Sequence, residues 1–144
     1  MEYSFDINNR AFKAIKERKK RVEIRATKVG ENHFDYSKLK ENDIINFTSF
    51  DGNTLKCIIG DVNWYNSIEE LLTMEGTRYT LSSTNDFNEG VKSINSINGY
   101  EEAIKINGVY AIHITPLNKL TTQWLLPTGG GVQLPLVINV WVLR

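Results

Sequence analysis

Several features common in proteins are scarce in this sequence, and each absence excludes a class of structure. Cys57 is the only cysteine, so the chain can form neither an internal disulfide nor a zinc site of several thiolates. The longest apolar stretch, Leu134 to Leu143, contains Pro135 and Asn139 and is about half the roughly 20 residues that span a bilayer. The first six residues carry acids where a signal peptide needs a basic end. We therefore expect a cytoplasmic protein with no membrane segment, no metal and no cofactor.

The chain also lacks an overall charge of either sign. Its 144 residues include 17 Lys and Arg and 17 Asp and Glu, which excludes a uniformly basic nucleic-acid protein. The charges are nevertheless segregated: nine bases and two acids lie between Arg10 and Lys28, a net charge of +7, and the remainder carries −7. Such a basic pole attracts a polyanion to one place. The same bases are also explained by a solvated helix end, where positive charge suits the helix dipole and no ligand is needed. Charge alone therefore leaves both interpretations open.

The composition, 41% hydrophobic with 10% aromatic residues, is enough for one domain with its own core. Apolar residues at helical spacing, with Asp6 as the N-cap, predict a helix from about Ile7 to Lys19. The segment Arg21 to Ala26 then alternates charged and apolar residues, which predicts a half-buried strand. Arg21, Glu23 and Arg25 would share one face of it. Glu23 would either orient an arginine toward a phosphate or simply form a salt bridge.

The rest of the chain alternates loops with short elements. A long loop is expected over residues 27–42, and a capping box at Ser67 and Glu70 predicts a short helix that ends at Gly76. Asp51-Gly52-Asn53 predicts a hairpin turn. The further expected elements are strands at Ile44–Phe50 and Thr54–Val62, short helices at Glu89–Asn95 and Tyr100–Ile106, a strand at Val109–Ile114 that ends at Pro116, and a strand at Leu136–Leu143.

The order of these pieces resembles the ASCH domain family, whose members show a helix, a Gly-Lys-Lys-like turn and a Glu-x-Arg strand. The segment Arg18-Lys19-Lys20-Arg21-Val22-Glu23-Ile24-Arg25 is similar to that turn and strand. Arg18 and Asn42 stand where the family usually has turn glycines. Later segments follow in the family's order, and the resemblance extends from about Ile7 to Pro116. These later segments are Lys40–Phe47, Val62–Tyr65 with Ser67–Leu72, and Gly108–Ile114.

The resemblance implies an α+β, mainly β fold: a PUA-like small β-barrel with short helices packed around it, formed by residues 1–116. Residues 117–144 lie outside the resemblance, and we expect a C-terminal extension that adds a strand or arm. Self-association through this extension, or a role as a protein-interaction module, is the alternative to a ligand-binding role.

The resemblance also implies a cleft that binds RNA or a nucleotide beside the lysine turn. The residues expected in it are Lys19, Lys20, Glu23, Arg25 and Tyr65. Cations would neutralise phosphate and an aromatic ring would stack on a base. Trp64 and Tyr65 cannot both face inward on a strand, and we favour Tyr65 as the site residue. His113 and Cys57 are expected to be structural.

A catalytic alternative stays open, in which the protein is a small hydrolase acting on RNA or a modified nucleoside. Some relatives in the ASCH family remove an acetyl group from acetylated cytidine with a lysine, a threonine and a distant glutamate. Lys20 matches the lysine and Glu89 loosely the glutamate, but Glu23 stands where the threonine is expected. For a ribonuclease, Lys20 and Glu23 would be the acid and base.

Overall fold

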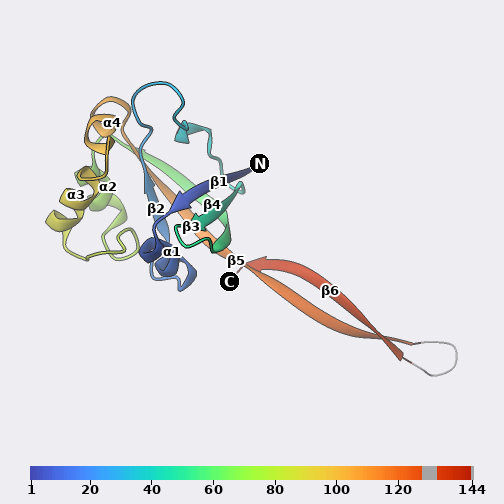
Figure 1. Ribbon diagram of the computed structural model, residues 1–144. Helices are drawn as coiled ribbons and strands as arrows, with labels where there is room; N and C mark the ends of the chain where they lie inside the picture. Colours follow the sequence, from blue (N-terminus) through green and yellow to red (C-terminus); the bar gives the residue numbers. More distant parts are fainter. Residues whose placement is uncertain (128–132, 144) are drawn as a thin grey trace.

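A mixed, curled β-sheet is the central element of the fold (Figure 1). The computed structural model describes the backbone of residues 1–127 and 133–143 and the side chains of residues 1–117. No helix in this part of the chain is both long and apolar enough to cross a membrane. The elements are β1 (Glu2–Ile7), α1 (Asn9–Lys16), β2 (Val22–Arg25), the 3₁₀ helix η1 (Tyr36–Lys38), β3 (Ile44–Ser49), β4 (Thr54–Tyr65), α2 (Ile68–Glu75), α3 (Phe87–Asn95), α4 (Tyr100–Asn107), β5 (Val109–Pro127) and β6 (Gln133–Leu143).

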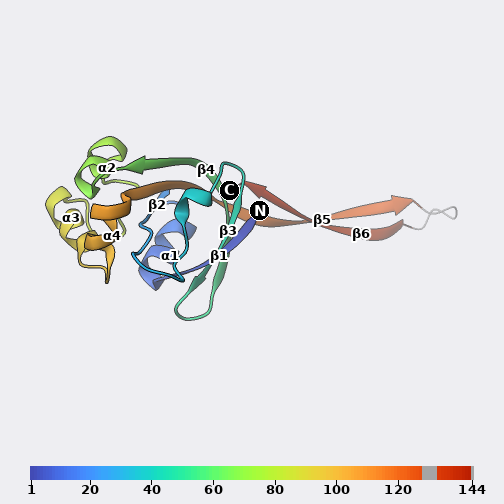
Figure 2. The same cartoon turned by 90° about the horizontal axis from the view of Figure 1, so that it is seen from above.

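The strands follow the order β1-β3-β4-β5-β2, and β6 pairs with β5. β1 and β3 are parallel, with Phe5 opposite Phe47, and the other pairings are antiparallel. The sheet curls into a half-barrel that carries four α-helices. Figures 1 and 2 show α2, α3 and α4 gathered at one end of the molecule, while α1 lies apart from them beside β1 and β2. The fold is therefore α+β.

Two hydrophobic clusters lie on opposite faces of the central strands. Ala111 belongs to a cluster with α2, α4 and the apolar residues of β2, whereas Ile112 belongs to a cluster with α1, β3 and β4. Successive side chains of a strand point to opposite faces, which explains the division. Glu23 of β2 is in register with Ile112, so its side chain lies on the α1 face. The charged residues of β2 are thereby placed beneath α1.

The first seven residues correct the prediction for the N-terminus. Residues 2–7 form β1, because Tyr3, Phe5 and Ile7 alternate with polar residues at the period of a strand. The helix begins later, after Asn8, whose side chain accepts a hydrogen bond of 2.8 Å from the backbone N–H of Ala11. Asp6 is therefore a strand residue and not the N-cap.

The helix also ends earlier than predicted, at Lys16 instead of Lys19. The chain adopts the left-handed conformation at Arg18, with φ 62°, and the backbone N–H groups of Lys19 and Lys20 both donate to the Ala14 carbonyl. Asn42 is left-handed as well, with φ 71°. Both residues thus occupy backbone conformations that glycine adopts most readily.

Replacing Arg18 with glycine should raise the free energy of unfolding by roughly 1 kcal/mol, because a side chain in the left-handed region costs about 1–2 kcal/mol. Urea denaturation would measure the change. Asn42→Gly should raise the free energy of unfolding by less, since asparagine tolerates the left-handed conformation. Lys13→Gly is the control inside α1 and should lower stability by about 0.5–1 kcal/mol. A loss of stability in Arg18→Gly would contradict the expectation.

The middle of the chain confirms the prediction of a hairpin. β3 and β4 pair antiparallel across a turn in which Gly52 has φ 90°, and α2 begins after Ser67, whose side chain accepts from the Glu70 N–H.

The strand β5 is longer than predicted. It continues through Pro116 to Pro127 instead of ending at Pro116. Pro116 is at the end of the β4 pairing, opposite Cys57, where a missing N–H donor costs least. Residues 117–127 of β5 then pair with β6.

Candidate functional site

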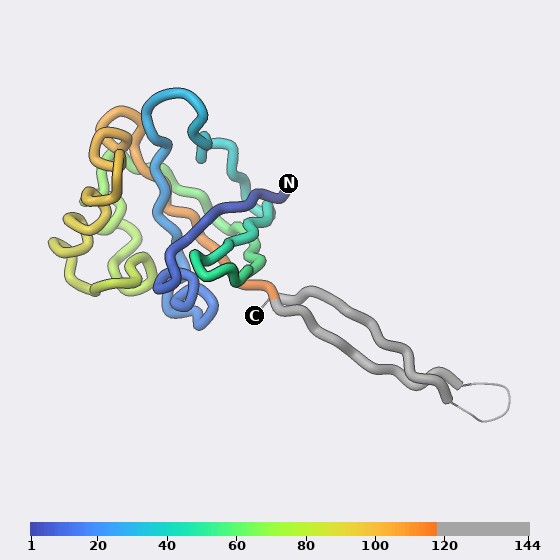
Figure 3. Tube along the Cα trace, in the orientation of Figure 1, coloured from blue at the N-terminus to red at the C-terminus, as the bar shows by residue number. Residues whose placement is uncertain are grey.

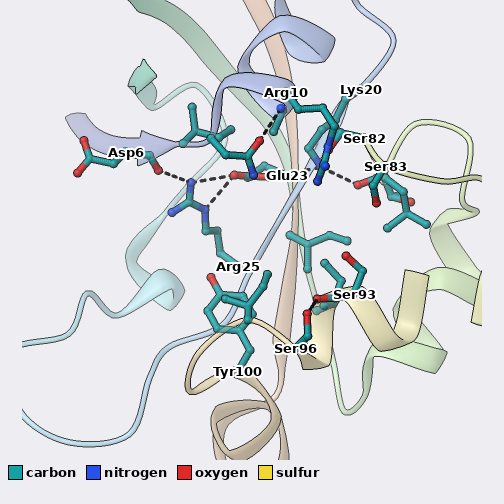
Figure 4. Close-up of a pocket in the computed structure, with 18 of the residues that line it drawn as sticks. Asp6, Arg10, Lys20, Glu23, Arg25, Ser82, Ser83, Ser93, Ser96 and Tyr100 are labelled. Carbon is teal, nitrogen blue, oxygen red and sulfur yellow. Dashed lines mark hydrogen bonds and ion pairs between the residues drawn. The ribbon is translucent and has the colours of Figure 1, made fainter. Parts of the chain in front are cut away.

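A cavity of about 330 Å³ lies beneath α1, beside β2 (Figure 4). Charged side chains, serine hydroxyls and an apolar wall share its surface. The lining comes from five parts of the chain that are distant in sequence. The cavity is lined by, among others, Asp6, Arg10, Lys20, Glu23, Arg25, Phe50, Thr80, Leu81, Ser82, Ser83, Ser93, Ile94, Ser96, Ile97 and Tyr100.

Lys20 is buried at the base of this cavity, with 5% of its surface exposed. Its ammonium group donates to the carbonyls of Val22 at 2.7 Å and Thr80 at 2.6 Å, and lies 3.4 Å from Glu23 Oε1. The ammonium group thus has two carbonyl acceptors and one ionic partner within the protein. Lys20 therefore ties the segment around Thr80 to β2.

The backbone reinforces this attachment. The N–H groups of Arg21 and Val22 both donate to the Tyr79 carbonyl, at 2.8 and 3.0 Å. Figure 3 shows the turn after α1, in blue, beside the yellow-green chain that follows α2, although Lys20 and Thr80 are 60 residues apart in sequence. One wall of the cavity is thus held by Lys20 and its neighbours.

Glu23 and Arg25 complete a buried group of three charges. Arg25 donates from Nε to Glu23 Oε2 at 3.0 Å and from Nη2 to the Asp6 carbonyl at 2.9 Å, and its Nη2 forms an ion pair with the same Glu23 oxygen at 2.8 Å (Figure 4). Because Lys20 holds the other oxygen, Oε1, both oxygens of the Glu23 carboxylate have cationic partners. We call Lys20, Glu23 and Arg25 the buried triad.

Electrostatics favour the charged forms of Glu23 and Arg25 in this triad. Burial raises the pKa of Glu23, but the charges of Arg25 and Lys20 outweigh it, and the pKa of Glu23 falls below its ordinary value. Burial lowers the pKa of Arg25, yet the Glu23 carboxylate more than compensates and the pKa is raised. For Lys20, burial dominates and lowers the pKa although Glu23 opposes it. Glu23 is consequently an ionised anchor for two cations at neutral pH.

The structure brings together three of the five residues predicted for the site. Lys20, Glu23 and Arg25 line one cavity. Lys19 instead projects outward, with its side chain 77% exposed and 3.2 Å from the Glu17 carboxylate. Tyr65 lies at the end of β4, where its hydroxyl donates to Glu75 at 2.5 Å.

Tyr65 belongs to a separate polar cluster around Glu75. His113 and Asn63 also contact this carboxylate, at 2.6 and 3.0 Å. His113 is thus hydrogen-bonded, as predicted. Trp64 is half exposed and donates its indole N–H to the Asn107 carbonyl. Neither Trp64 nor any residue of the Glu75 cluster lines the cavity.

Two other expectations concern residues away from the cavity. Cys57 is fully buried, and burial raises its pKa to about 12, which disfavours the reactive thiolate form. Glu89 accepts a hydrogen bond from Thr84 and does not line the cavity. Within the residues whose side chains are described, no group of three or more His, Cys, Asp or Glu side chains is placed to hold a metal ion.

Several lining residues were missed by the sequence analysis. Phe50 follows β3 and is 73% exposed at the cavity, although a phenylalanine at the end of a predicted strand is ordinarily assigned to the core. Arg10 lies on α1 with its Nε 3.4 Å from Ser82 Oγ. The serines, at positions 82, 83, 93 and 96, carry no sequence signal, because they converge only through the packing of α3 and the loop before it.

Comparisons with known proteins identify relatives among solved structures. The crystal structure of hypothetical protein PH0355 is 31% identical, covers 81% of this chain and 99% of its own, and has a TM-score of 0.68. The solution NMR structure of protein PF0455 from Pyrococcus furiosus is also 31% identical, covers 81% of this chain and 97% of its own, and has a TM-score of 0.63. No family model and no curated protein matches the chain. Because nearly the full length of both relatives aligns at this identity, the chain belongs to the family of PH0355 and PF0455.

Proposed function

We propose that this protein is an ASCH-like member of the PUA-like superfamily that binds RNA or a nucleotide in the cavity beside the buried triad. The observation that carries the proposal is the combination of an exposed aromatic ring, Phe50, with guanidinium groups around one hollow of about 330 Å³. A nucleotide requires this combination, because its base stacks on aromatic rings while its phosphate pairs with cations.

The backbone supports the family part of the proposal. A helix, a lysine turn and a Glu-x-Arg strand follow one another as α1, residues 17–21 and β2. The two positions where the ASCH family usually has glycine are Arg18 and Asn42, and both have positive φ angles. Positive φ angles at these two positions are compatible with turns in which glycine is usual. The curled sheet is in keeping with a PUA-like barrel.

The lining of the cavity supports the ligand part of the proposal. Phe50 and the apolar side chains of Ile97 and Tyr100 offer a surface for a base. Arg10, which is exposed, is available to a phosphate, whereas the charge of Arg25 is already balanced by Glu23. The serine hydroxyls at positions 82, 83, 93 and 96 suit the hydroxyls of a ribose.

The hydrolase alternative receives less support from the same geometry. A general acid or base must have a free position within hydrogen-bond reach of the substrate. The Lys20 ammonium and both oxygens of the Glu23 carboxylate already have buried partners within the protein. We therefore propose a binding role for the cavity and a structural one for Lys20 and Glu23.

Replacing Phe50 with alanine tests the proposal. The loss of one stacking contact should weaken binding of a single-stranded RNA of about ten nucleotides by about 1–3 kcal/mol, roughly 5- to 150-fold. Fluorescence anisotropy at low salt would measure the affinity. Trp64→Ala is the control, because Trp64 is an exposed aromatic residue outside the cavity, and its affinity should match the wild type. Equal affinities of both variants, or a wild type that binds neither RNA nor nucleotides, would reject the proposal.

A further inference from the structure

A second hollow, of about 450 Å³, adjoins the cavity on the other side of Ser82. We call it the Tyr79 groove. It lies between the turn after α1 and the chain that follows α2, and it carries four cationic side chains around one aromatic ring. Its lining includes Arg18, Lys19, Arg21, Arg78, Tyr79 and Ser82.

Three of the four cations of this groove differ from those of the buried triad in having no ion-pair partner among the described side chains. Arg18, Arg21 and Arg78 are exposed, and none of them forms an ion pair with a described side chain. Lys19 alone is paired, with Glu17. Since no acidic side chain lines the groove, the positive charges of these three arginines are not balanced within it. Three of the nine bases of the basic pole noted in the sequence, Arg18, Lys19 and Arg21, thus lie in the groove, and Arg78 joins them from a distant part of the chain.

The groove is built on a rigid support. Tyr79 is held by the two backbone hydrogen bonds from Arg21 and Val22, and the Arg21 and Arg78 guanidinium carbons lie 4.2 and 5.0 Å from the centre of its ring. Stacking on an aromatic ring orients a guanidinium while leaving its N–H groups at the edge available to oxygen acceptors. The two arginines are therefore held in place for anions.

The groove and the cavity share Leu81 and Ser82 in their linings. A ligand that extends out of the cavity across this common wall would meet the arginines next. A free nucleotide ends within the cavity, whereas a polynucleotide has further phosphates to place. Exposed arginines in a hollow next to the cavity suit the further phosphates of a single-stranded backbone.

Building on the proposed function, we infer that the ligand is a single-stranded RNA, with one nucleotide in the cavity and the phosphates of its neighbours along the Tyr79 groove. The groove then contributes affinity without reading the base, because phosphate contacts carry no sequence information directly. Binding of the polymer should depend strongly on salt, and binding of a mononucleotide only weakly.

The double variant Arg21→Gln with Arg78→Gln tests this inference. For a single strand, each lost phosphate contact should reduce the slope of log affinity against log salt by about 0.7, so about 1.4 for two. Anisotropy with an RNA of about ten nucleotides, measured over a range of salt, gives the slope. The same variant should bind a nucleoside monophosphate as the wild type does. Thermal unfolding checks that the variant is folded.

The matched control is Lys38→Gln with Lys40→Gln, which removes the same charge from exposed residues outside both hollows and should leave the slope unchanged. An unchanged slope in the arginine variant, or an equal loss in the control, would overturn the inference. If Phe50→Ala still weakens binding in that case, the proposed function stands without the groove. If the wild type binds mononucleotides but not the longer RNA, only the inference about the groove is overturned. If it binds neither, the proposed function is overturned as well.

Discussion

Replacing Lys20 with methionine should lower the free energy of unfolding by about 3–5 kcal/mol, the cost of removing one partner from a buried ion pair. The substitution keeps the length of the side chain but removes the ammonium that satisfies Glu23 and the carbonyls of Val22 and Thr80. It also releases the segment around Thr80 from β2. Chemical denaturation followed by circular dichroism would measure the loss.

The neighbouring residue provides the control for this prediction. Lys19 is also a lysine and is also ion-paired, but its side chain is 77% exposed. An exposed pair contributes about 1 kcal/mol or less, so Lys19→Met should be nearly neutral. If the two variants lost similar stability, Lys20 would not be the anchor that its contacts indicate.

The pH dependence of the free energy of unfolding tests the role of Glu23 in the same triad. Its pKa is lower in the folded protein than in the unfolded chain, so its stabilising contribution is present above the unfolded value, 4.5, and is lost as the pH falls through the folded value. In Glu23→Gln this part of the pH dependence should disappear. If the variant lost stability at acid pH as the wild type does, Glu23 would not be held as an anion in the folded protein.

Replacing Phe47 with alanine should lower the free energy of unfolding by about 3–5 kcal/mol, because a large side chain is removed from a fully packed site. Phe47 is 0% exposed in β3, where it pairs with Phe5 of β1 and Leu55 of β4. The cavity left behind would weaken the core on which α1 packs. Urea denaturation would measure the change.

Phe50 is the matched control, three residues further along the chain. It is 73% exposed, so Phe50→Ala should change stability by only about 0.5 kcal/mol. The two phenylalanines thereby separate stability from binding: Phe47→Ala should impair folding, and Phe50→Ala should impair the binding of RNA. Comparable stability losses would show that Phe50 is part of the core.

Much of the local structure could be predicted because it depends on neighbouring residues. The turn at Asp51-Gly52-Asn53 and the capping box at Ser67 predicted the β3–β4 hairpin and the start of α2. The prediction was wrong where two local signals competed. The alternation over residues 2–7 indicates a strand, but the cap-like Asp6 before Ile7 favoured an early helix. Pairing with β3, which is distant in sequence, decides between them.

The site was only partly predictable for the same reason. The alternation over residues 21–26 predicted that Glu23 and Arg25 share one face, and Lys20 was added to them because of the resemblance to the ASCH lysine turn. Tyr65 could not be placed, because its hydroxyl bonds to Glu75 on a different element. Phe50, Arg10 and the serines reach the cavity from separate elements, and no spacing along the chain indicates that.

The amino-acid sequence by itself determined the strands and helices of the middle of the chain, the composition of the core and the charge of the basic segment, since these follow from periodicity, turn residues and counting. The tertiary structure alone decided how that charge is divided. Lys20 is buried because Thr80 and Val22 supply its acceptors, while Arg21 and Arg78 remain exposed on Tyr79. Whether a cation is an internal anchor or is available to a ligand depends on acceptors from distant residues, which only the folded chain brings within reach.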